Sequence, residues 1–581
     1  MLRRLAHYVG EYKKYFIITP ILVIVETIIE LLMPRMMAAI VDVAIPSGDL
    51  NYTVRMGFIM LLVALASMTL GVLSARFSTR AAMGFGANLR RGQFNRVQEF
   101  SFGDIDRFSS ASLVTRMTND TNQLQQFVNM GLRLMVRTPV MIIVAVIMCL
   151  TINVKLCAIF LVVVPLVALG IFAIMRVCNK LFGALQAKID NVNNTVQENL
   201  VAIRVVKAFV RSGYEKTKFQ KVNDELMDTG FQVGGRMVLM MPLLMLGMCG
   251  ATVAAYYFGG GMVIGGNMLV GDLSSFNNYI FQILMSVMMI GMMMLQFSRA
   301  TACARRIDEV LTHEPDIRDG EAAQTVALPE SKGKVEFKGV HFKYNADDTG
   351  DDVLEDINLT VEPGEFVAIV GGTGTGKSSL VNLIPRFYDV SGGQVLLDGM
   401  DVRDYPIEEL RSRIGMVLQS NVLFSGTIRE NLKWGNPNAT EEEVIQAAKD
   451  AQAYDFVMSF PEGFDTYMEQ GGVNVSGGQK QRLCIARAML RKPSVLILDD
   501  STSAVDSATE AAIRESFHQN LADTSVIIIA QRISSVQYAD KIIVLDDGQI
   551  KGVGTHDELM ANNAIYQEIY ASQQEGVSEN G

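Results

Sequence analysis

A phosphate-binding loop is the clearest chemical motif in the sequence. Residues 371–378 follow the spacing G-x-x-x-x-G-K-S, after an apolar run at Val367–Val370 and before a helical pattern. Glycines at these positions let backbone amides surround phosphate groups at the start of a helix. We expect Lys377 to contact the β- and γ-phosphates of a nucleotide and Ser378 to hold Mg²⁺. The residues of this loop expected to bind the nucleotide are Gly371, Gly372, Thr373, Gly374, Thr375, Gly376, Lys377, Ser378 and Ser379.

A second phosphate element is an aspartate at the end of an apolar run. Val495–Leu498 predicts a buried strand, which places Asp499 at its C-terminal end. Ligands of open parallel sheets collect at this edge. We therefore expect Asp499 to hold Mg²⁺ together with Ser378.

A third motif, Val475–Arg482, predicts another anion site. Ser476 is placed to cap a helix, and the two glycines after it expose backbone amides. One nucleotide does not need two such sites in one domain. We therefore expect this motif to face a nucleotide held by another subunit, through Ser476, Gly477, Gly478 and Gln479.

The part of the chain before residue 300 is strongly apolar. Of the 581 residues 49% are hydrophobic and 19% are charged, and the mean hydropathy is +0.24, so a wholly soluble or disordered chain is excluded. The net charge of -10 argues against a nucleic-acid partner. Crossing a bilayer takes about 20 helical residues, and six apolar runs are long enough. They lie at Phe16–Val43, Gly57–Leu73, Val136–Ile152, Leu156–Met175, Met237–Ile264 and Phe276–Phe297.

Basic residues predict the orientation of these six spans. Nine arginines lie between residues 76 and 137 and ten Lys or Arg between residues 176 and 236, whereas the opposite loops carry only Arg55 and Lys155. By the positive-inside rule, both long loops and both termini are cytoplasmic. Helical spacing continues into these loops, so we expect long stalks. The stalks should end in short docking turns near residues 102–110 and 209–214.

Two glutamates interrupt the first apolar run. Glu26 and Glu30 stand one helical turn apart, with Arg35 after them, and charge inside a membrane is costly enough to suggest a role. Two interpretations are open. The glutamates pair mutually or snorkel into a water-filled vestibule, or they contact a cationic substrate.

The domain organisation follows from these patterns. We predict an all-α membrane domain over residues 1–315, a polar linker over 316–332, an α/β P-loop ATPase domain over 333–572 and a disordered polar tail over 573–581.

The sequence resembles the ABC transporter family, in its exporter type with six spanning helices before one ATPase domain. The resemblance implies that Tyr344 stacks on the adenine of ATP, that Gln419 joins the Mg²⁺ site and that Asp506 contacts the nucleotide. It also implies that two ATPase domains close head to tail around two ATPs, and that closure pulls on the docking turns. The resemblance rests on five elements that occur in this order: Tyr344, residues 371–378, Gln419, residues 475–479, and Asp499 followed by Ser503-Ala504-Val505-Asp506.

Two positions depart from the family pattern, and both concern the catalytic step. The family usually has a glutamate after the magnesium-side aspartate, to polarise the attacking water, but this chain has Asp500. It also usually has a histidine after the next strand, where this chain has Gln531. Asp500 is one methylene shorter than glutamate, and glutamine cannot carry positive charge. We therefore predict a site that binds ATP and hydrolyses it poorly.

These departures predict a heterodimeric exporter, with a second, non-identical half-transporter as partner. A slow homodimeric exporter and an ATP-gated switch or pore are the alternatives. Drugs, lipids and peptides all remain possible substrates, because a fold does not determine function. Absence of a recognisable targeting signal suits a multi-pass protein of the bacterial inner membrane, in contact with its lipids.

Overall fold

The computed structural model describes residues 1–320, 327–344, 352–500 and 505–578. The chain divides into two compact units. Unit 1 comprises Met1–Gln98 and Ser110–His313, and unit 2 comprises Glu99–Ser109 and Glu314–Gly581. The short segment Glu99–Ser109 therefore belongs with the C-terminal unit, although it interrupts the N-terminal one.

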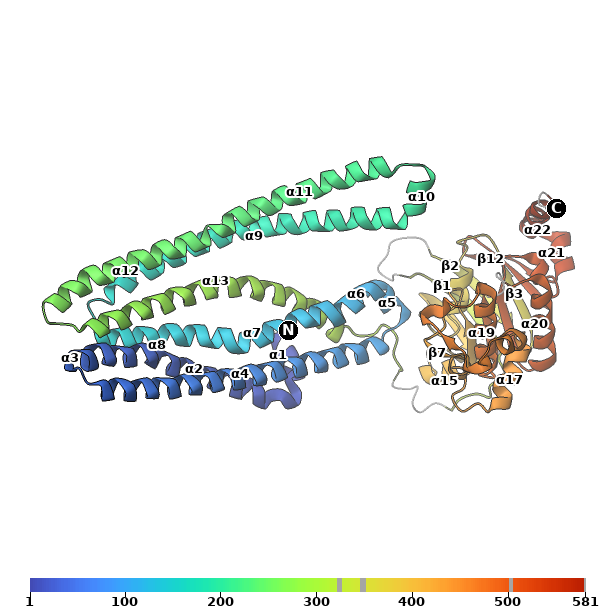
Figure 1. The fold of residues 1–581 in the computed structure, drawn as a ribbon. Coiled ribbons are helices and arrows are strands. Elements are labelled where there is room, and N and C mark those ends of the chain that lie inside the picture. Colours follow the sequence, from blue (N-terminus) through green and yellow to red (C-terminus); the bar gives the residue numbers. More distant parts are fainter. Residues whose placement is uncertain (321–326, 345–351, 501–504, 579–581) are drawn as a thin grey trace. The chain divides into compact units, whose positions relative to one another are not determined.

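Unit 1 is entirely helical, as the apolar runs predict (Figure 1). Several of its helices continue through internal prolines, for example α2 through Pro20 and Pro34. Its helices are α1 (Leu2–Leu5), α2 (Lys13–Ala39), α3 (Ile45–Ser47), α4 (Leu50–Gln98), α6 (Ser110–Thr115), α7 (Thr121–Met130), α8 (Val136–Ile152), α9 (Ala158–Val201), α10 (Ile203–Ala208), α11 (Ser212–Val238), α12 (Met240–Ile264) and α13 (Val270–Thr312).

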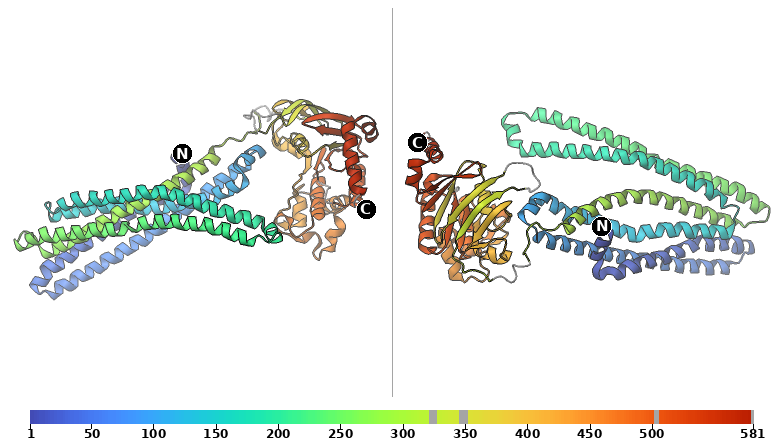
Figure 2. Two further views of the ribbon diagram at one scale, coloured as in Figure 1. Left: turned by 90° about the horizontal axis from the view of Figure 1, so that it is seen from above. Right: turned by 180° about the vertical axis from the view of Figure 1, so that it is seen from behind.

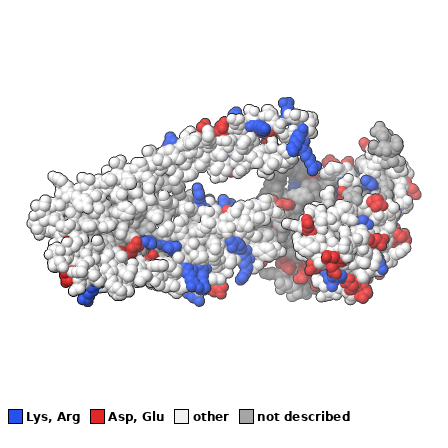
Figure 3. Space-filling model, viewed as in Figure 1, with Lys and Arg blue, Asp and Glu red and all other residues white. Residues whose placement is uncertain are grey.

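The prediction of six membrane spans is confirmed. In the part of the chain that the structure describes, six helical stretches are long and apolar enough to cross a bilayer. Each is far longer than a bilayer requires, so each apolar run continues as a polar helix. The stretches are Arg3–Ser47, Leu50–Gln98, Ser110–Ile152, Ala158–Val201, Ser212–Ile264 and Val270–Thr312. On the face seen in Figure 3, the surface around the connection between α12 and α13 shows few charged side chains.

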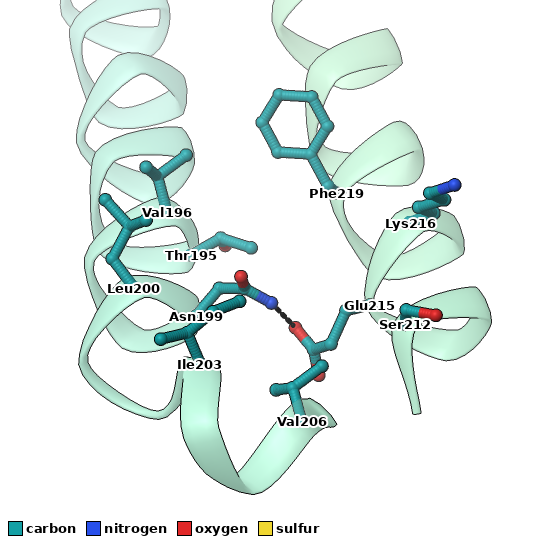
Figure 4. A pocket seen from close by; sticks show the side chains of 10 residues that line it. All are labelled: Thr195, Val196, Asn199, Leu200, Ile203, Val206, Ser212, Glu215, Lys216 and Phe219. Carbon is teal, nitrogen blue, oxygen red and sulfur yellow. Dashed lines mark hydrogen bonds between the residues drawn. The ribbon is translucent and has the colours of Figure 1, made fainter. Parts of the chain in front are cut away.

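Helices α9 and α11 run side by side and are joined by α10, which forms the tip of a long hairpin (Figure 1). Near this tip lies a mainly apolar pocket of about 290 Å³ (Figure 4). Asn199 donates to Glu215 across it at 3.0 Å, which ties the two helices together. At the tip, Phe209 and Val210 are 74% and 83% exposed. Such exposure of large apolar side chains is typical of a surface that another domain covers.

Unit 2 is an α/β domain built on two larger sheets and one small one, seen from behind in Figure 2. The six-stranded sheet has the order β12-β11-β3-β10-β9-β6 and is parallel except for β12. The antiparallel sheet has the order β2-β1-β4-β5. The strands are β1 (Val335–Phe342), β2 (Leu354–Val361), β3 (Phe366–Val370), β4 (Gly392–Leu397), β5 (Met400–Asp401), β6 (Ile414–Val417), β7 (Gly426–Thr427), β8 (Tyr467–Met468), β9 (Val495–Asp499), β10 (Ser525–Ile529), β11 (Lys541–Asp546) and β12 (Gln549–Gly554).

Apolar side chains that point alternately to the two faces of the central strands form the core of unit 2. In β3, Val367 and Ile369 join one apolar cluster while Ala368 and Val370 join the other, so both faces of the sheet are covered. The helices of this unit are α5 (Phe102–Phe108), α14 (Lys377–Asn382), α15 (Ile407–Ser412), α16 (Ile428–Lys433), α17 (Glu441–Asp450), α18 (Tyr454–Ser459), α19 (Gly477–Met489), α20 (Ser507–Asn520), α21 (His556–Asn562) and α22 (Ala564–Ser578).

Helix α22 extends into the segment for which the composition predicts a disordered tail. Ile565, Ile569 and Tyr570 pack against the core and hold the helix on the domain. Gln573 accepts a hydrogen bond from the backbone N–H of Ile533 at 2.8 Å. Residues 579–581 lie outside the described residues.

Candidate functional site

The phosphate loop follows β3, a central strand paired with β10 and β11. Two of its glycines are required by their surroundings. A Cβ on Gly371 would lie 2.1 Å from the carbonyl oxygen of Leu545, which belongs to the neighbouring strand. Gly376 has a φ of +92° and immediately precedes α14. The loop can therefore turn sharply from the strand into the helix, which aims backbone N–H groups at a bound anion.

Lys377 is the cation of this loop. Its Nζ donates to the carbonyl oxygen of Gly371 at 3.0 Å and to that of Gly372. Burial lowers the pKa of Lys377, while the charges of Asp499 and Asp500 oppose that shift. A partly buried ammonium that rests on loop carbonyls is well placed to bind phosphate oxygens, which would relieve its desolvation.

Ser378 and Asp499 come together although they are far apart in sequence. The hydroxyl of Ser378 donates to Oδ1 of Asp499 at 3.0 Å. Burial raises the pKa of Asp499, and the hydrogen bond from Ser378 opposes this shift. Mg²⁺ prefers oxygen ligands and keeps several waters, so a hydroxyl beside a carboxylate is a suitable donor set. When bound there, Mg²⁺ would neutralise charge on the phosphates. Gln419 follows β6, the strand next to β9, and is exposed.

Tyr344 also reaches the phosphate loop. Its hydroxyl lies 2.8 Å from the hydroxyl of Ser379, the second residue after Lys377. The Tyr344 side chain is 48% exposed, which leaves ring surface for a base. The pairing with Ser379 is a contact that the sequence pattern alone did not predict.

Asp500 and Gln531 meet at the C-terminal edge of the sheet. Strands β9 and β10 are adjacent, with Asp499 opposite Ile529, and the two residues follow these strand ends. Gln531 Nε2 donates to Oδ2 of Asp500 at 2.6 Å. Asp500 has a φ of +46°, a conformation that non-glycine residues adopt uncommonly. A neutral amide therefore occupies one oxygen of the carboxylate beside the magnesium-side aspartate.

The anion motif at residues 475–482 forms the start of α19. Ser476 accepts from the backbone N–H of Gln479 at 3.3 Å, and the Gln479 side chain accepts from the backbone N–H of Ser476 at 3.0 Å. This reciprocal capping box fixes the first turn, which contains Gly477 and Gly478.

Asp506 caps the helix α20, a role that the sequence analysis did not assign to it. It accepts from the backbone N–H of Thr509 at 3.0 Å and from its hydroxyl at 2.8 Å. These hydrogen bonds lower the pKa of Asp506. Ser503 and Ala504, which also carry the family resemblance, lie outside the described residues.

The intramembrane glutamates are paired with an arginine that the sequence analysis did not connect to them. Arg137 of α8 contacts Glu26 at 3.3 Å and Glu30 at 2.5 Å, both on α2. Arg35 instead pairs with Asp272 of α13 at 2.7 Å. The two glutamates are thus paired through an arginine of another helix and not with each other. Contact with a cationic substrate stays a prediction.

Comparison with known proteins agrees with this geometry. Residues 16–287 match the family described as "ABC transporter transmembrane region", and residues 354–503 match "ABC transporter". The chain belongs to the ABC transporter family.

Several bacterial ABC proteins are similar over nearly the whole chain. An uncharacterised ABC transporter ATP-binding protein of Bacillus subtilis (strain 168) is 38% identical over 95% of this chain and 95% of its own. One of Mycobacterium tuberculosis (strain ATCC 25618 / H37Rv) is 39% identical over 99% and 98%. A protein of B. subtilis named as a putative multidrug export ATP-binding/permease protein is 33% identical over 99% of both chains.

The fold is also that of a solved structure, a bacterial Atm1-family ABC exporter with ATP bound. The TM-score is 0.80, with 24% identity over 97% of this chain and 99% of the other. This ABC protein thus combines a multi-pass membrane domain and an ATP-binding domain on one chain, and it has the fold of that exporter. Membership of the family implies ATP hydrolysis coupled to transport.

Proposed function

We propose that this ABC protein is one subunit of a heterodimeric exporter, and that its own phosphate loop forms a site that holds Mg²⁺-ATP but hydrolyses it slowly. The observation that carries the proposal is the hydrogen bond of 2.6 Å between Gln531 and Asp500. It occupies the carboxylate that would have to orient the attacking water.

The chemistry of phosphoryl transfer makes this pair important. Catalysis depends almost entirely on positioning and on electrostatic stabilisation. Asp500 is one methylene shorter than the usual glutamate, which retracts its carboxylate by about 1.5 Å, and such a displacement can cost about a hundredfold in rate. Gln531 donates a hydrogen bond but cannot become a cation near the γ-phosphate.

The groups proposed for ATP binding lie close together, which supports the binding half of the proposal. Lys377, the Ser378–Asp499 pair and Tyr344 all converge on the loop after β3. The capped first turn of α19 is equally well formed, and it would complete the ATP site of a partner chain. We therefore assign slow hydrolysis to the site made from this chain's phosphate loop and the partner's signature motif, and faster hydrolysis to the other site.

In the proposed cycle, ATP brings the two ATPase domains together and the stalks transmit this closure. The exposed Phe209 and Val210 at the tip of the α9–α11 hairpin, together with the segment containing α5, would serve as the docking turns. The membrane helices of the two chains then open the cavity between them toward the outside. Both termini lie on the cytoplasmic side of a bacterial inner membrane in this proposal. The relative named for multidrug export supports a small-molecule substrate, and lipids or peptides would suit the same scaffold.

The test is to measure ATP hydrolysis by this chain in lipid, first purified alone and then after co-expression with a transporter-like chain encoded beside it in the source genome. We expect negligible activity alone, activity with the partner, and its loss when the partner's catalytic glutamate is changed. Robust activity of the chain alone that disappears in Asp500→Asn would establish a working homodimer and refute the proposal.

A further inference from the structure

One residue of unit 2 touches both the adenine-side tyrosine and the segment that interrupts unit 1. Tyr388 donates its hydroxyl proton to Oδ2 of Asp106, on α5, at 2.8 Å. Its ring also meets the ring of Tyr344 at 90°, with centroids 5.1 Å apart. These two contacts link Tyr344 to α5 through a single side chain.

The α5 segment is held firmly enough to respond to such a link. Phe102, the first residue of α5, stacks on Phe387 with ring centroids 4.3 Å apart. Ser101 and Asp104 form a capping box that fixes the first turn. A shift of Phe387 and Tyr388 would therefore be passed to α5 as a whole rather than absorbed by fraying of its first turn.

The other end of the link lies at the phosphate loop. Tyr344 contacts Ser379 through its hydroxyl at 2.8 Å, and Ser379 is part of α14. Phe342 also packs against Tyr344, with centroids 4.9 Å apart and an angle of 74°. The orientation of the Tyr344 ring thus depends on the loop at one side and on aromatic neighbours at the other. A base stacked on its exposed surface would restrict that orientation.

We propose that Tyr388 is a positioning residue that transmits ATP occupancy of this chain's own site to α5, without hydrolysis. The inference deepens the proposed function and rests on it in two respects, that ATP is held at this site and that its adenine stacks on Tyr344. Occupancy would align Tyr344, and Tyr344 would fix the ring of Tyr388, whose hydroxyl secures Asp106. A site that keeps its ATP would in this way hold α5 docked throughout the transport cycle.

The hydroxyl of Tyr388 remains a donor under ordinary conditions. Burial raises its pKa, and the neighbouring carboxylate of Asp106 raises it further. The link therefore persists at neutral pH.

The experiment follows hydrogen exchange in the full chain with its partner in lipid nanodiscs, with and without the non-hydrolysable analogue AMP-PNP and Mg²⁺. In the unaltered protein, nucleotide should slow exchange in residues 99–109 and in residues 203–214. Tyr388→Phe keeps the ring and removes the hydroxyl. We expect it to weaken the nucleotide-dependent slowing in residues 99–109 by about fivefold, the scale of one net hydrogen bond. The response of residues 203–214 and the affinity for AMP-PNP should stay unchanged.

Tyr405→Phe is the matched control. Tyr405 is a buried tyrosine of the same unit whose hydroxyl donates to Leu397 at 2.8 Å, so its loss tests a structural effect alone. Asp106→Ala removes the acceptor from an exposed position and should reproduce the effect of Tyr388→Phe even if that variant folds poorly. The inference would be overturned if residues 99–109 responded to nucleotide as in the unaltered protein in both Tyr388→Phe and Asp106→Ala. It would also be overturned if these variants lost the response of residues 203–214 as much as that of residues 99–109. AMP-PNP is not hydrolysed, so this experiment does not depend on the rate of hydrolysis. Failure of the proposed function would instead be seen as ATP turnover at this site in the hydrolysis assay.

Discussion

Buried charges are treated in opposite ways in the membrane helices and at the phosphate loop. In unit 1, Arg137 is shared by Glu26 and Glu30, and Ser74 also donates to Glu26 at 3.3 Å. At the phosphate loop, the ammonium of Lys377 rests on neutral carbonyls, and burial shifts the pKa of Lys377 and that of Asp499 toward their neutral forms. The comparison teaches that charges paired with each other stabilise a fold, whereas charges left partly unsatisfied are available to a ligand.

The strongest test of this comparison is Lys377→Ala. We expect ATP affinity to fall by about a thousandfold, because the desolvated cation that would meet the phosphates is gone. The free energy of unfolding without nucleotide should hardly fall, because the buried ammonium disfavours folding. Fluorescence titration with an ATP analogue and thermal unfolding measure the two quantities. Lys338→Ala, at an exposed side chain of β1, is the control and should change neither quantity. A large loss of stability in Lys377→Ala would break the comparison.

Arg137→Met should have the reverse effect. It leaves the carboxylates of Glu26 and Glu30 without their cation. Because Glu26 is buried, the loss of its partner should cost up to about 3 kcal/mol of unfolding free energy. ATP affinity should not change. Unfolding in bicelles checks the first expectation and nucleotide titration the second. Glu30→Gln, at the more exposed partner, should lose clearly less stability than Arg137→Met, and an equal loss would contradict the central role of the arginine.

Replacing Asp500 and Gln531 together should separate ATP binding from ATP hydrolysis at the proposed site. Asp500→Glu combined with Gln531→His should raise hydrolysis at this chain's site by about a hundredfold, because it extends the carboxylate and supplies an ionisable ring. Nucleotide affinity should stay within about twofold. Turnover is measured with the partner's own catalytic glutamate changed, so that only this site contributes. If Asp500→Asn lowers turnover as much as the double variant raises it, Asp500 already acts as a base.

The smallest effect expected is the pH dependence that Asp499 confers on stability. Burial raises its pKa in the folded protein above the ordinary value of 3.8, so ionised Asp499 destabilises the fold at neutral pH. Asp499→Asn should therefore have a higher free energy of unfolding than the unaltered protein at pH 7, in the absence of nucleotide and Mg²⁺.

This advantage should disappear as the pH falls through the raised pKa toward 3.8, because the native carboxyl then binds its proton. Thermal unfolding between pH 4 and pH 8 measures the difference. Adding Mg²⁺-ATP should reverse the order of stability at pH 7. An advantage that is constant across this range would show that Asp499 is not desolvated.

Much of the fold follows from local patterns. The six apolar runs, the strand before residue 371 and the strand that ends at Asp499 each depend on periodicity within a short window, and the structure contains all of them. Contacts between residues that are far apart in the sequence were harder to predict. Nothing near Glu26 in the sequence indicates Arg137, because the two residues are brought together by the packing of α2 against α8.

The sequence by itself determined the local features of this protein: the phosphate-loop spacing at residues 371–378, the positions of the six spans, and the two side chains, Asp500 and Gln531, on which the proposal of slow hydrolysis depends. Only the tertiary structure decided which of these groups meet. It joins Ser378 to Asp499 and Gln531 to Asp500 because parallel strands bring distant segments to one edge of a sheet. It likewise joins Tyr388 to Asp106, which lie 282 positions apart in the sequence. The physical reason is that residue type and spacing set local backbone preferences, while contacts between distant segments depend on how whole elements pack.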